Sequence, residues 1–202
     1  KRNQIQTILQ KLENGPNFIG SWMINSSSIC EGIIEHFEKD REKQHRGASQ
    51  LGVNLDVKKS TDITIMPNEI NQPGNEIFTR YFEGLFECYK DYLDQYPFLK
   101  EIGDKLEIGA FNVCRYQSGG HFQKLHAERA SLATLHRTLA WMTYLNDVDD
   151  GGDTYFSHYD LTVQPKKGLT IIWPADWTHA HQGRIVKSGP KYIITGWMNY
   201  SS

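Results

Sequence analysis

The stretches that decide the fold are GLTIIW (168–173) and KYIITGWMNY (191–200), near the end of the chain. Both are short and rich in β-branched and aromatic residues, which is typical of strands. Stretches of the same kind precede them at IGAFNVCRY (108–116), TLAWMTYLN (138–146) and LTVQP (161–165). Gly, Pro and Asp clusters separate these stretches at fairly regular intervals, and this arrangement favours a barrel or a double-sheet jelly roll.

Before Glu107 the hydrophobic residues recur with helical spacing instead. Residues 28–39 (SICEGIIEHFEK) carry an apolar stripe of this kind, and so do residues 75–96. Pro97 helps to end the second run. The pattern therefore predicts two amphipathic helices whose apolar faces pack on the core.

The segment between the predicted helices, 41–74, is polar and contains Gly and Pro. We expect a loop there, with one strand around Ile63–Met66, and long loops in compact domains are often lids or binding loops. Helices first and strands after predict an α+β fold: a double-stranded β-helix (jelly roll) core buttressed by N-terminal helices. We treat residues 1–202 as one domain, with a helical buttress over about 1–107 and the jelly-roll core over about 108–202.

Composition excludes several classes of protein. The 202 residues are 39% hydrophobic and 23% charged, with a formal net charge of -2, which is ordinary for a soluble globular protein and offers no broad attraction for nucleic acid or membrane. The sparse cysteines Cys30, Cys88 and Cys114 do not form a disulfide framework and favour a reducing compartment. The start, KRNQIQTILQ, is not a signal peptide, and no apolar run is long enough to span a membrane, so we expect a cytoplasmic location.

Two histidine-containing segments stand out. His126 and Glu128 are two residues apart, and on a strand such residues point to the same face, where they offer a metal two adjacent ligands. His179 and His181 have the same spacing in a later segment. Either of them added to the first pair completes a set of two histidines and one carboxylate. Such a set leaves coordination positions open for a chelating cosubstrate and dioxygen, and it is typical of non-haem Fe(II) oxygenases.

Lys191, ten residues beyond His181, begins a predicted strand. A dicarboxylate cosubstrate needs a cation for its remote carboxylate, and a lysine supplies a charge-assisted hydrogen bond. A solvated surface lysine is the alternative interpretation of this position.

The second half of the chain resembles the prolyl 4-hydroxylase-like family of 2-oxoglutarate oxygenases. The matching features run in order through residues 111–199. They are the step Tyr116 to Gly119, the pair His126 and Glu128, YLNDVDDGGDTYF (144–156), QPKKGLTIIWP (164–174), HQGRIVKSGPK (181–191) and Trp197. Each feature is weak separately, but their common order is specific.

The resemblance implies an enzyme that uses Fe(II), 2-oxoglutarate and dioxygen to hydroxylate an unactivated C–H bond, with ascorbate as a candidate reductant. Its leading substrate is a peptidyl prolyl residue, so a peptide or protein is the expected partner. The family has its distal histidine ten residues before the lysine that binds the cosubstrate. This spacing selects His181 as the third ligand, assigns Lys191 to the 2-oxoglutarate carboxylate and leaves His179 as a neighbour of the pocket.

Further residues of the pocket are less well determined. Glu128 stands where the family usually has Asp, and Gln123 stands where a Tyr is common, so a hydroxyl in the pocket is either missing or comes from Tyr116. Thr154 is either a hydroxyl donor to the cosubstrate or an ordinary strand residue. Arg137 is interpreted as a surface ion pair rather than a substrate contact. Trp173 and Trp197 are expected to fill the core.

Alternatives to the oxygenase remain. DVDDGGD (147–153) is interpreted as an Asp- and Gly-rich hairpin turn, because an EF-hand loop beginning at Asp147 would need Glu where His158 stands. A non-catalytic jelly-roll binding module and a cupin metalloenzyme that needs no 2-oxoglutarate are the rival functions.

Overall fold

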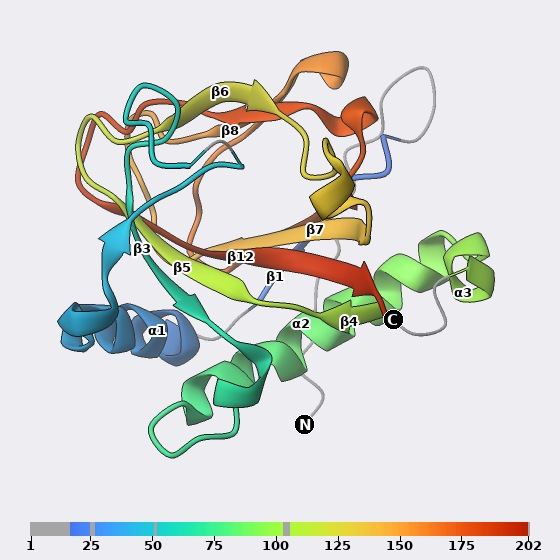
Figure 1. Cartoon of the computed structure of the whole chain (residues 1–202), viewed down its shortest axis with the longest axis horizontal. Helices are drawn as coiled ribbons and strands as arrows, with labels where there is room; N and C mark the ends of the chain where they lie inside the picture. Colours follow the sequence, from blue (N-terminus) through green and yellow to red (C-terminus); the bar gives the residue numbers. More distant parts are fainter. Residues whose placement is uncertain (1–16, 25–26, 51, 103–105, 202) are drawn as a thin grey trace.

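Two antiparallel sheets face each other, and helices cover the outer face of the larger one (Figure 1). The computed structural model describes residues 17–24, 27–50, 52–102 and 106–201. Within these residues the larger sheet has, in order, β1 (Gly20–Met23), β10 (Leu169–Pro174), β7 (Arg137–Tyr144), β12 (Lys191–Tyr200), β5 (Phe111–Tyr116), β3 (Thr61–Ile65) and β2 (His45–Arg46), with β4 (Leu106–Ile108) paired to β12. The smaller sheet has β6 (Phe122–His126), β11 (His181–Gly183), β8 (Thr154–Phe156) and β9 (Leu161–Val163).

The helices lie against the larger sheet on the side away from the smaller one (Figure 1). They are α1 (Ser27–Lys39), α2 (Glu76–Gln95) and the short α3 (Phe98–Ile102). The 3-10 turns are η1 (Arg41–Lys43), η2 (Pro67–Glu69), η3 (Leu132–Thr134), η4 (Ser157–Tyr159) and η5 (Trp177–His179). In the described residues, no helix is long and apolar enough to cross a membrane.

The larger sheet is buried on both faces. Ile194 of β12 belongs to the core between this sheet and the helices, while its neighbour Ile193 belongs to the core between the two sheets. Successive strand residues point to opposite faces, so a central strand with both faces covered is apolar without alternation. This is why KYIITGWMNY is so clearly a strand in the sequence.

Gly196 lets the Trp141 side chain pack directly against the backbone of β12. A Cβ placed on this glycine would lie 2.5 Å from the Trp141 side chain and 2.9 Å from Cβ of Phe111. Both contacts are too short for real atoms, so the packing of β7, β12 and β5 in this region requires glycine.

The predicted double-stranded β-helix with helices on one side is confirmed, and differences lie in the detail. The predicted strand 108–116 is two strands, β4 and β5, interrupted at residues 109 and 110. The apolar face of α2 is centred on Phe78, Tyr81, Leu85, Cys88 and Tyr92, whereas Ile77 and Tyr89, which recur with the same helical spacing, are only partly buried.

The short strands β1, β8 and β11 were not predicted. Each has only three or four residues, too few for a periodic pattern to be recognised. The sequence start and the first part of the predicted helical buttress lie outside the described residues.

Candidate metal centre

Strand pairing brings the predicted ligands together. β6 ends at His126 and β11 begins at His181, and these two residues are direct partners across the antiparallel pair. Glu128 follows β6 by two residues, beyond the end of the strand, so the expected strand from His126 to Glu128 is wrong in this detail. The carboxylate nevertheless returns to the histidines: its Oε1 lies 3.2 Å from Nε2 of His181 and 3.7 Å from Nε2 of His126.

Both imidazoles are oriented by their own backbone. Nδ1 of His126 hydrogen-bonds the carbonyl oxygen of Lys124 at 2.7 Å, and Nδ1 of His181 hydrogen-bonds the carbonyl oxygen of His179 at 2.9 Å. A carbonyl accepts, so in each ring Nδ1 carries a proton and Nε2 is the nitrogen that faces the carboxylate of Glu128. One donor atom from each of His126, Glu128 and His181 lies within 4.8 Å of the others. Two aimed nitrogens and a carboxylate oxygen fit a divalent metal.

A tryptophan and an arginine hold the carboxylate. The indole N–H of Trp197 donates to Oε2 of Glu128 at 2.7 Å, which leaves Oε1 facing the histidines. The guanidinium of Arg137 stacks on Trp197, 3.6 Å from the ring centre, and donates to the backbone carbonyl of Glu128 at 3.0 Å. Trp197 is therefore not simply core filler, and the expected ion pair of Arg137 exists, 3.7 Å from Oε2 of Glu128, but is mostly buried rather than on the surface. Both roles depend on contacts that the sequence pattern does not contain.

Two of the proposed ligands, His126 and Glu128, have the ionisation that a metal needs. Burial lowers the pKa of His126 to about 4, with smaller contributions from the charges of His181 and Lys58. Burial by itself would raise the pKa of Glu128, but the hydrogen bond and charge of His181, together with His126 and Trp197, lower it to about 2. Near neutral pH the carboxylate is thus ionised and the His126 ring is neutral.

The three ligand residues line a cavity of about 540 Å³, which also contains the predicted cosubstrate residues. Lys191 is 3% exposed and its Nζ donates to the carbonyl oxygen of Gly152 at 2.8 Å. No carboxylate forms an ion pair with Lys191 among the residues that the structure describes. Burial lowers its pKa to about 8. An ammonium with three donors and one protein partner is suited to bind an anion. The surface-lysine interpretation is therefore excluded.

Tyr116 and Thr154 line the same cavity as this lysine. Tyr116 is the strand partner of Lys191, whose Nζ lies 4.7 Å from the centre of the Tyr116 ring. The Tyr116 hydroxyl is hydrogen-bonded to Ser60. Thr154 is both a strand residue of β8 and a cavity residue, and its hydroxyl shares a 2.6 Å hydrogen bond with Tyr144.

Gly152 makes room for the lysine. Its φ is +71°, and a Cβ there would lie 3.2 Å from Cδ of Lys191. The backbone conformation of Gly152 and its closeness to the Lys191 side chain therefore explain why glycine stands at this position.

His179 is buried beside the centre but faces away from it. It ends η5 rather than lying on a strand, so the expected strand face shared with His181 is wrong. Its Nε2 hydrogen-bonds the carbonyl oxygen of Asn17 at 2.8 Å, and its Nδ1 contacts the Thr178 hydroxyl at 2.9 Å. Both ring nitrogens of His179 therefore already have hydrogen-bond partners. His179 affects the metal centre through its backbone carbonyl, which accepts the hydrogen bond that orients His181.

Phe122 was missed by the sequence reasoning. Its ring stacks on that of His126, with centroids 3.9 Å apart and planes 15° apart. The two residues are four apart on β6, so period-two alternation alone would have placed them on the same face.

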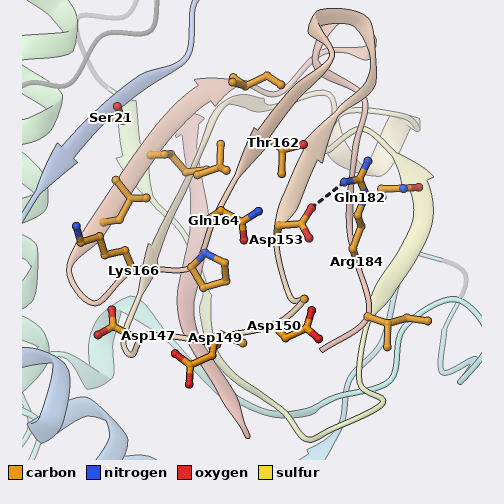
Figure 2. A pocket seen from close by; sticks show the side chains of 18 of the residues that line it. Ser21, Asp147, Asp149, Asp150, Asp153, Thr162, Gln164, Lys166, Gln182 and Arg184 are labelled. Atoms are coloured by element: carbon orange, nitrogen blue, oxygen red, sulfur yellow. Dashed lines mark hydrogen bonds and ion pairs between the residues drawn. The ribbon is translucent and has the colours of Figure 1, made fainter. Parts of the chain in front are cut away.

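A larger cavity, of about 1360 Å³, lies apart from the ligands (Figure 2). Along β11, His181 and Gly183 line the metal cavity while Gln182 and Arg184 line the larger one, so the two cavities are on opposite sides of this strand. Asp153 is paired there with Arg184 at 3.2 Å.

The aspartates of the DVDDGGD segment lie along the rim of this larger cavity. Asp147, Asp149 and Asp150 are spread out and do not converge (Figure 2). In the part of the chain that the structure describes, the residues whose donor atoms meet as a metal site are His126, Glu128 and His181. The segment joins β7 of the larger sheet to β8 of the smaller sheet, so the expected hairpin turn is wrong and these residues form a connection between the sheets.

Comparisons with known proteins place these features in a family context. Residues 111–199 match the family described as the 2OG-Fe(II) oxygenase superfamily. Over 182 residues the chain is 26% identical to procollagen-lysine,2-oxoglutarate 5-dioxygenase 1 of Gallus gallus, covering 87% of this chain and 23% of that protein. Over 103 residues it is 31% identical to prolyl 4-hydroxylase subunit alpha-1 of Homo sapiens, covering 43% of this chain and 19% of that protein. The chain spans less than a quarter of the length of these two relatives.

Solved structures share the fold over nearly the whole chain. The viral collagen prolyl hydroxylase of Paramecium Bursaria Chlorella virus-1, in its 2OG complex, superimposes with a TM-score of 0.66 at 20% identity, covering 92% of this chain and 97% of that one. A Pseudomonas putida prolyl-4-hydroxylase gives 0.68 at 16% identity, covering 91% and 93%. These matches confirm the fold that the sequence predicted.

Proposed function

We propose that this chain, which is similar in sequence and fold to prolyl hydroxylase-like 2-oxoglutarate oxygenases, is an Fe(II)- and 2-oxoglutarate-dependent dioxygenase that hydroxylates an unactivated C–H bond. One observation carries the proposal. Two aimed imidazoles, an ionised carboxylate and a buried lysine without a carboxylate partner among the described residues share one cavity.

His126, Glu128 and His181 are the proposed iron ligands. When bound, Fe(II) supplies the activation of dioxygen, with 2-oxoglutarate as the cosubstrate that is decarboxylated to succinate. The protein contributes the fixed direction of three ligand atoms through the carbonyls of Lys124 and His179 and the indole of Trp197. Ascorbate is the reductant that we expect to keep the iron divalent.

Lys191, Tyr116 and Thr154 form the proposed site for the remote carboxylate of 2-oxoglutarate. The lysine supplies the charge and a donor that no protein carboxylate occupies in the described residues. Tyr116 and Thr154 supply the flanking walls of the pocket and hydroxyl groups near it. Because Lys191 is buried, a charge-assisted hydrogen bond from it to the cosubstrate is stronger than it would be in water.

A peptidyl prolyl residue is the proposed target. The similar human protein is a prolyl 4-hydroxylase subunit, and a structurally similar prolyl hydroxylase from Trichoplax adhaerens is in complex with a peptide fragment of hypoxia inducible factor (TM-score 0.69, 14% identity). We therefore expect a peptide or protein partner for this chain.

The segment 41–74 supports the proposal of a covering loop. It contains β2, β3 and two 3-10 turns, and the residues between β2 and β3 form one wall of the cavity. Within that wall the side-chain amide of Gln50 donates to the backbone carbonyl of Glu128 at 3.2 Å. We expect shortening of residues 48–56 to weaken peptide turnover, and unchanged turnover would remove this role.

The test of the proposed function is an anaerobic titration of Fe(II) and 2-oxoglutarate into metal-free protein, followed by the visible charge-transfer absorption of a chelated 2-oxo acid. The variants His126→Ala, His181→Ala and Lys191→Ala are measured beside the parent. We expect absorption in the parent, loss of it in both histidine variants, and a much higher requirement for 2-oxoglutarate in the lysine variant.

The rival functions give different results in the same experiment. A parent that binds iron but not 2-oxoglutarate would be a cupin-type metalloenzyme. A folded parent that binds neither would be a non-catalytic binding module, and either result would overturn the oxygenase assignment.

A further inference from the structure

A buried ion pair lies in the wall of the metal cavity and is not used by the proposed mechanism. Nζ of Lys58 is 2.6 Å from Oδ2 of Asp62, with side chains 8% and 3% exposed. The other carboxylate oxygen of Asp62 accepts a hydrogen bond from the Ser60 hydroxyl at 2.7 Å. Removing two charges from water is costly, so a buried pair calls for an explanation beyond stability.

Lys58 lies close to the metal centre. Lys58 lines the same cavity as the ligands, and Asp62 is its hydrogen-bond partner in the structure, so one of its three donors is used. Its Nζ lies 5.5 Å from the centre of the Phe122 ring. A cation at this distance from an aromatic ring is attracted to it, more strongly where water is excluded.

Phe122 in turn packs directly on a proposed iron ligand. Its ring is stacked on that of His126 at 3.9 Å and 15°. The other proposed histidine ligand has more support, because Phe156 and Trp173 both contact His181, with centroids 5.4 and 5.2 Å away. In the described residues, the ring contacts of His126 are with Phe122 and His181. His126 is also the more exposed of the two histidines, with 18% of its side chain exposed against 7%.

These contacts form one continuous series from Asp62 to the metal centre. We propose that Lys58 is a positioning residue for the metal site: held by Asp62, it keeps the Phe122 ring against His126 and so keeps Nε2 of His126 directed at the metal. The inference rests on the proposed function, because it concerns the same ligands. It adds a residue from the segment before β3, far from the ligands in sequence.

The experiment measures metal binding rather than turnover. Co(II) is titrated into the metal-free protein, and its affinity and visible absorption spectrum are recorded for the parent and for Lys58→Met. Groups that orient a metal ligand typically change metal affinity by about 10- to 100-fold. We expect Lys58→Met to weaken Co(II) binding about 10-fold and to alter the spectrum. Lys58→Arg, which keeps the cation, should restore most of both.

Two further variants separate positioning from folding. Lys59→Met removes a neighbouring but exposed lysine and should bind Co(II) like the parent. Lys58→Met leaves Asp62 without its cation, so Lys58→Met/Asp62→Asn is measured as well, because it leaves no buried unpaired charge. Circular dichroism and thermal melting establish that each variant is folded.

A double-mutant cycle with Phe122→Leu tests the route of the effect. If Lys58 acts through the Phe122 ring, Lys58→Met should have little further effect on Co(II) affinity in the Phe122→Leu protein. An equal loss in both backgrounds would overturn the inference, as would a folded Lys58→Met protein with parental affinity and spectrum. A parent that binds no Co(II) would instead refute the proposed metal site itself.

Discussion

At the scale of single residues, the centre depends on partners that fix ligand direction. Each of the three proposed ligands has a second contact: a backbone carbonyl for His126 and for His181, and an indole N–H for Glu128. Such contacts set which atom faces the metal, since a carboxylate or an imidazole left free would rotate. The ligand atoms are therefore directed before a metal arrives.

The indole of Trp197 is the partner that can be removed most cleanly. Trp197→Phe keeps an aromatic ring for Arg137 to stack on but deletes the hydrogen bond to Oε2 of Glu128. We expect metal affinity to fall by about 10-fold or more, measured by titration with Co(II). Trp177→Phe, at a position 70% exposed, is the control and should bind like the parent. Equal affinity in both variants would contradict a role for the indole.

The charge of Lys191 makes cosubstrate binding depend on pH. Burial lowers the pKa of this lysine to about 8, so it is protonated below that pH and neutral above it. Only the ammonium form can pair with a carboxylate. The affinity of the Co(II)-loaded protein for 2-oxoglutarate should therefore be constant below about pH 8 and fall by up to about tenfold per pH unit above it.

The measurement is an isothermal titration of 2-oxoglutarate at a series of pH values. Lys191→Arg should keep its charge throughout and lose the decline above pH 8, because a guanidinium does not deprotonate in this range. A parental affinity that stays level to pH 9.5 would show that the charge of Lys191 is not what holds the cosubstrate.

At the scale of elements, strand pairing positions the residues of the site, whereas helix packing stabilises the sheet behind them. β6 and β11 place the two histidines opposite each other, and β12 beside β5 places Lys191 opposite Tyr116. α1 and α2 contribute no residue to the metal cavity in the described chain, and they bury the far face of the sheet that carries Lys191. The helices thus support the site through the sheet.

Neighbouring residues on α2 provide a test of this division. Leu85 is buried in the core, whereas Phe86, the next residue, is 57% exposed. Leu85→Ala should lower the free energy of unfolding by about 2–5 kcal/mol. Phe86→Ala should change it by less than about 0.5 kcal/mol. Urea denaturation measures both, and equal losses would show that the helix does not pack by this face.

At the scale of the whole molecule, the site joins both sheets. β6 and β11 of the smaller sheet supply the histidines, while β5 and β12 of the larger sheet supply Tyr116 and Lys191. A ligand that contacts both groups binds only when the sheets are assembled. Its binding energy is therefore added to the stability of the fold.

Thermal melting should show this coupling. With Co(II) and 2-oxoglutarate present at about 100 times their dissociation constants, the last ligand to bind adds about 2.7 kcal/mol. For a domain of this size that corresponds to a rise in Tm of about 5–10 °C. The control is His126→Ala, which should melt at the same temperature with and without both ligands. If the Tm of the parent protein is also unchanged by the ligands, they do not bind the folded protein.

Much of the fold could be read from local patterns. KYIITGWMNY and TLAWMTYLN were recognised because they are rich in β-branched and aromatic residues, and α2 because its buried residues recur every three or four positions. β8 and β11 escaped because three residues carry no period, and they are strands only because they pair with β6, β9 and each other. Their existence is a property of the assembled sheet.

The candidate site, like the fold, has some features that follow from local sequence and others that follow from tertiary contacts. The sequence by itself predicted the kinds of ligand, because the chemistry of a side chain and its spacing from its neighbours are local, and the family resemblance selected His181 and Lys191 among them. Only the tertiary structure decided that Trp197 and Arg137 hold Glu128, that His179 faces away, and that Lys58 reaches Phe122. These contacts join residues from separate segments of the chain, and their partners are chosen by sheet register and burial, which no local pattern records.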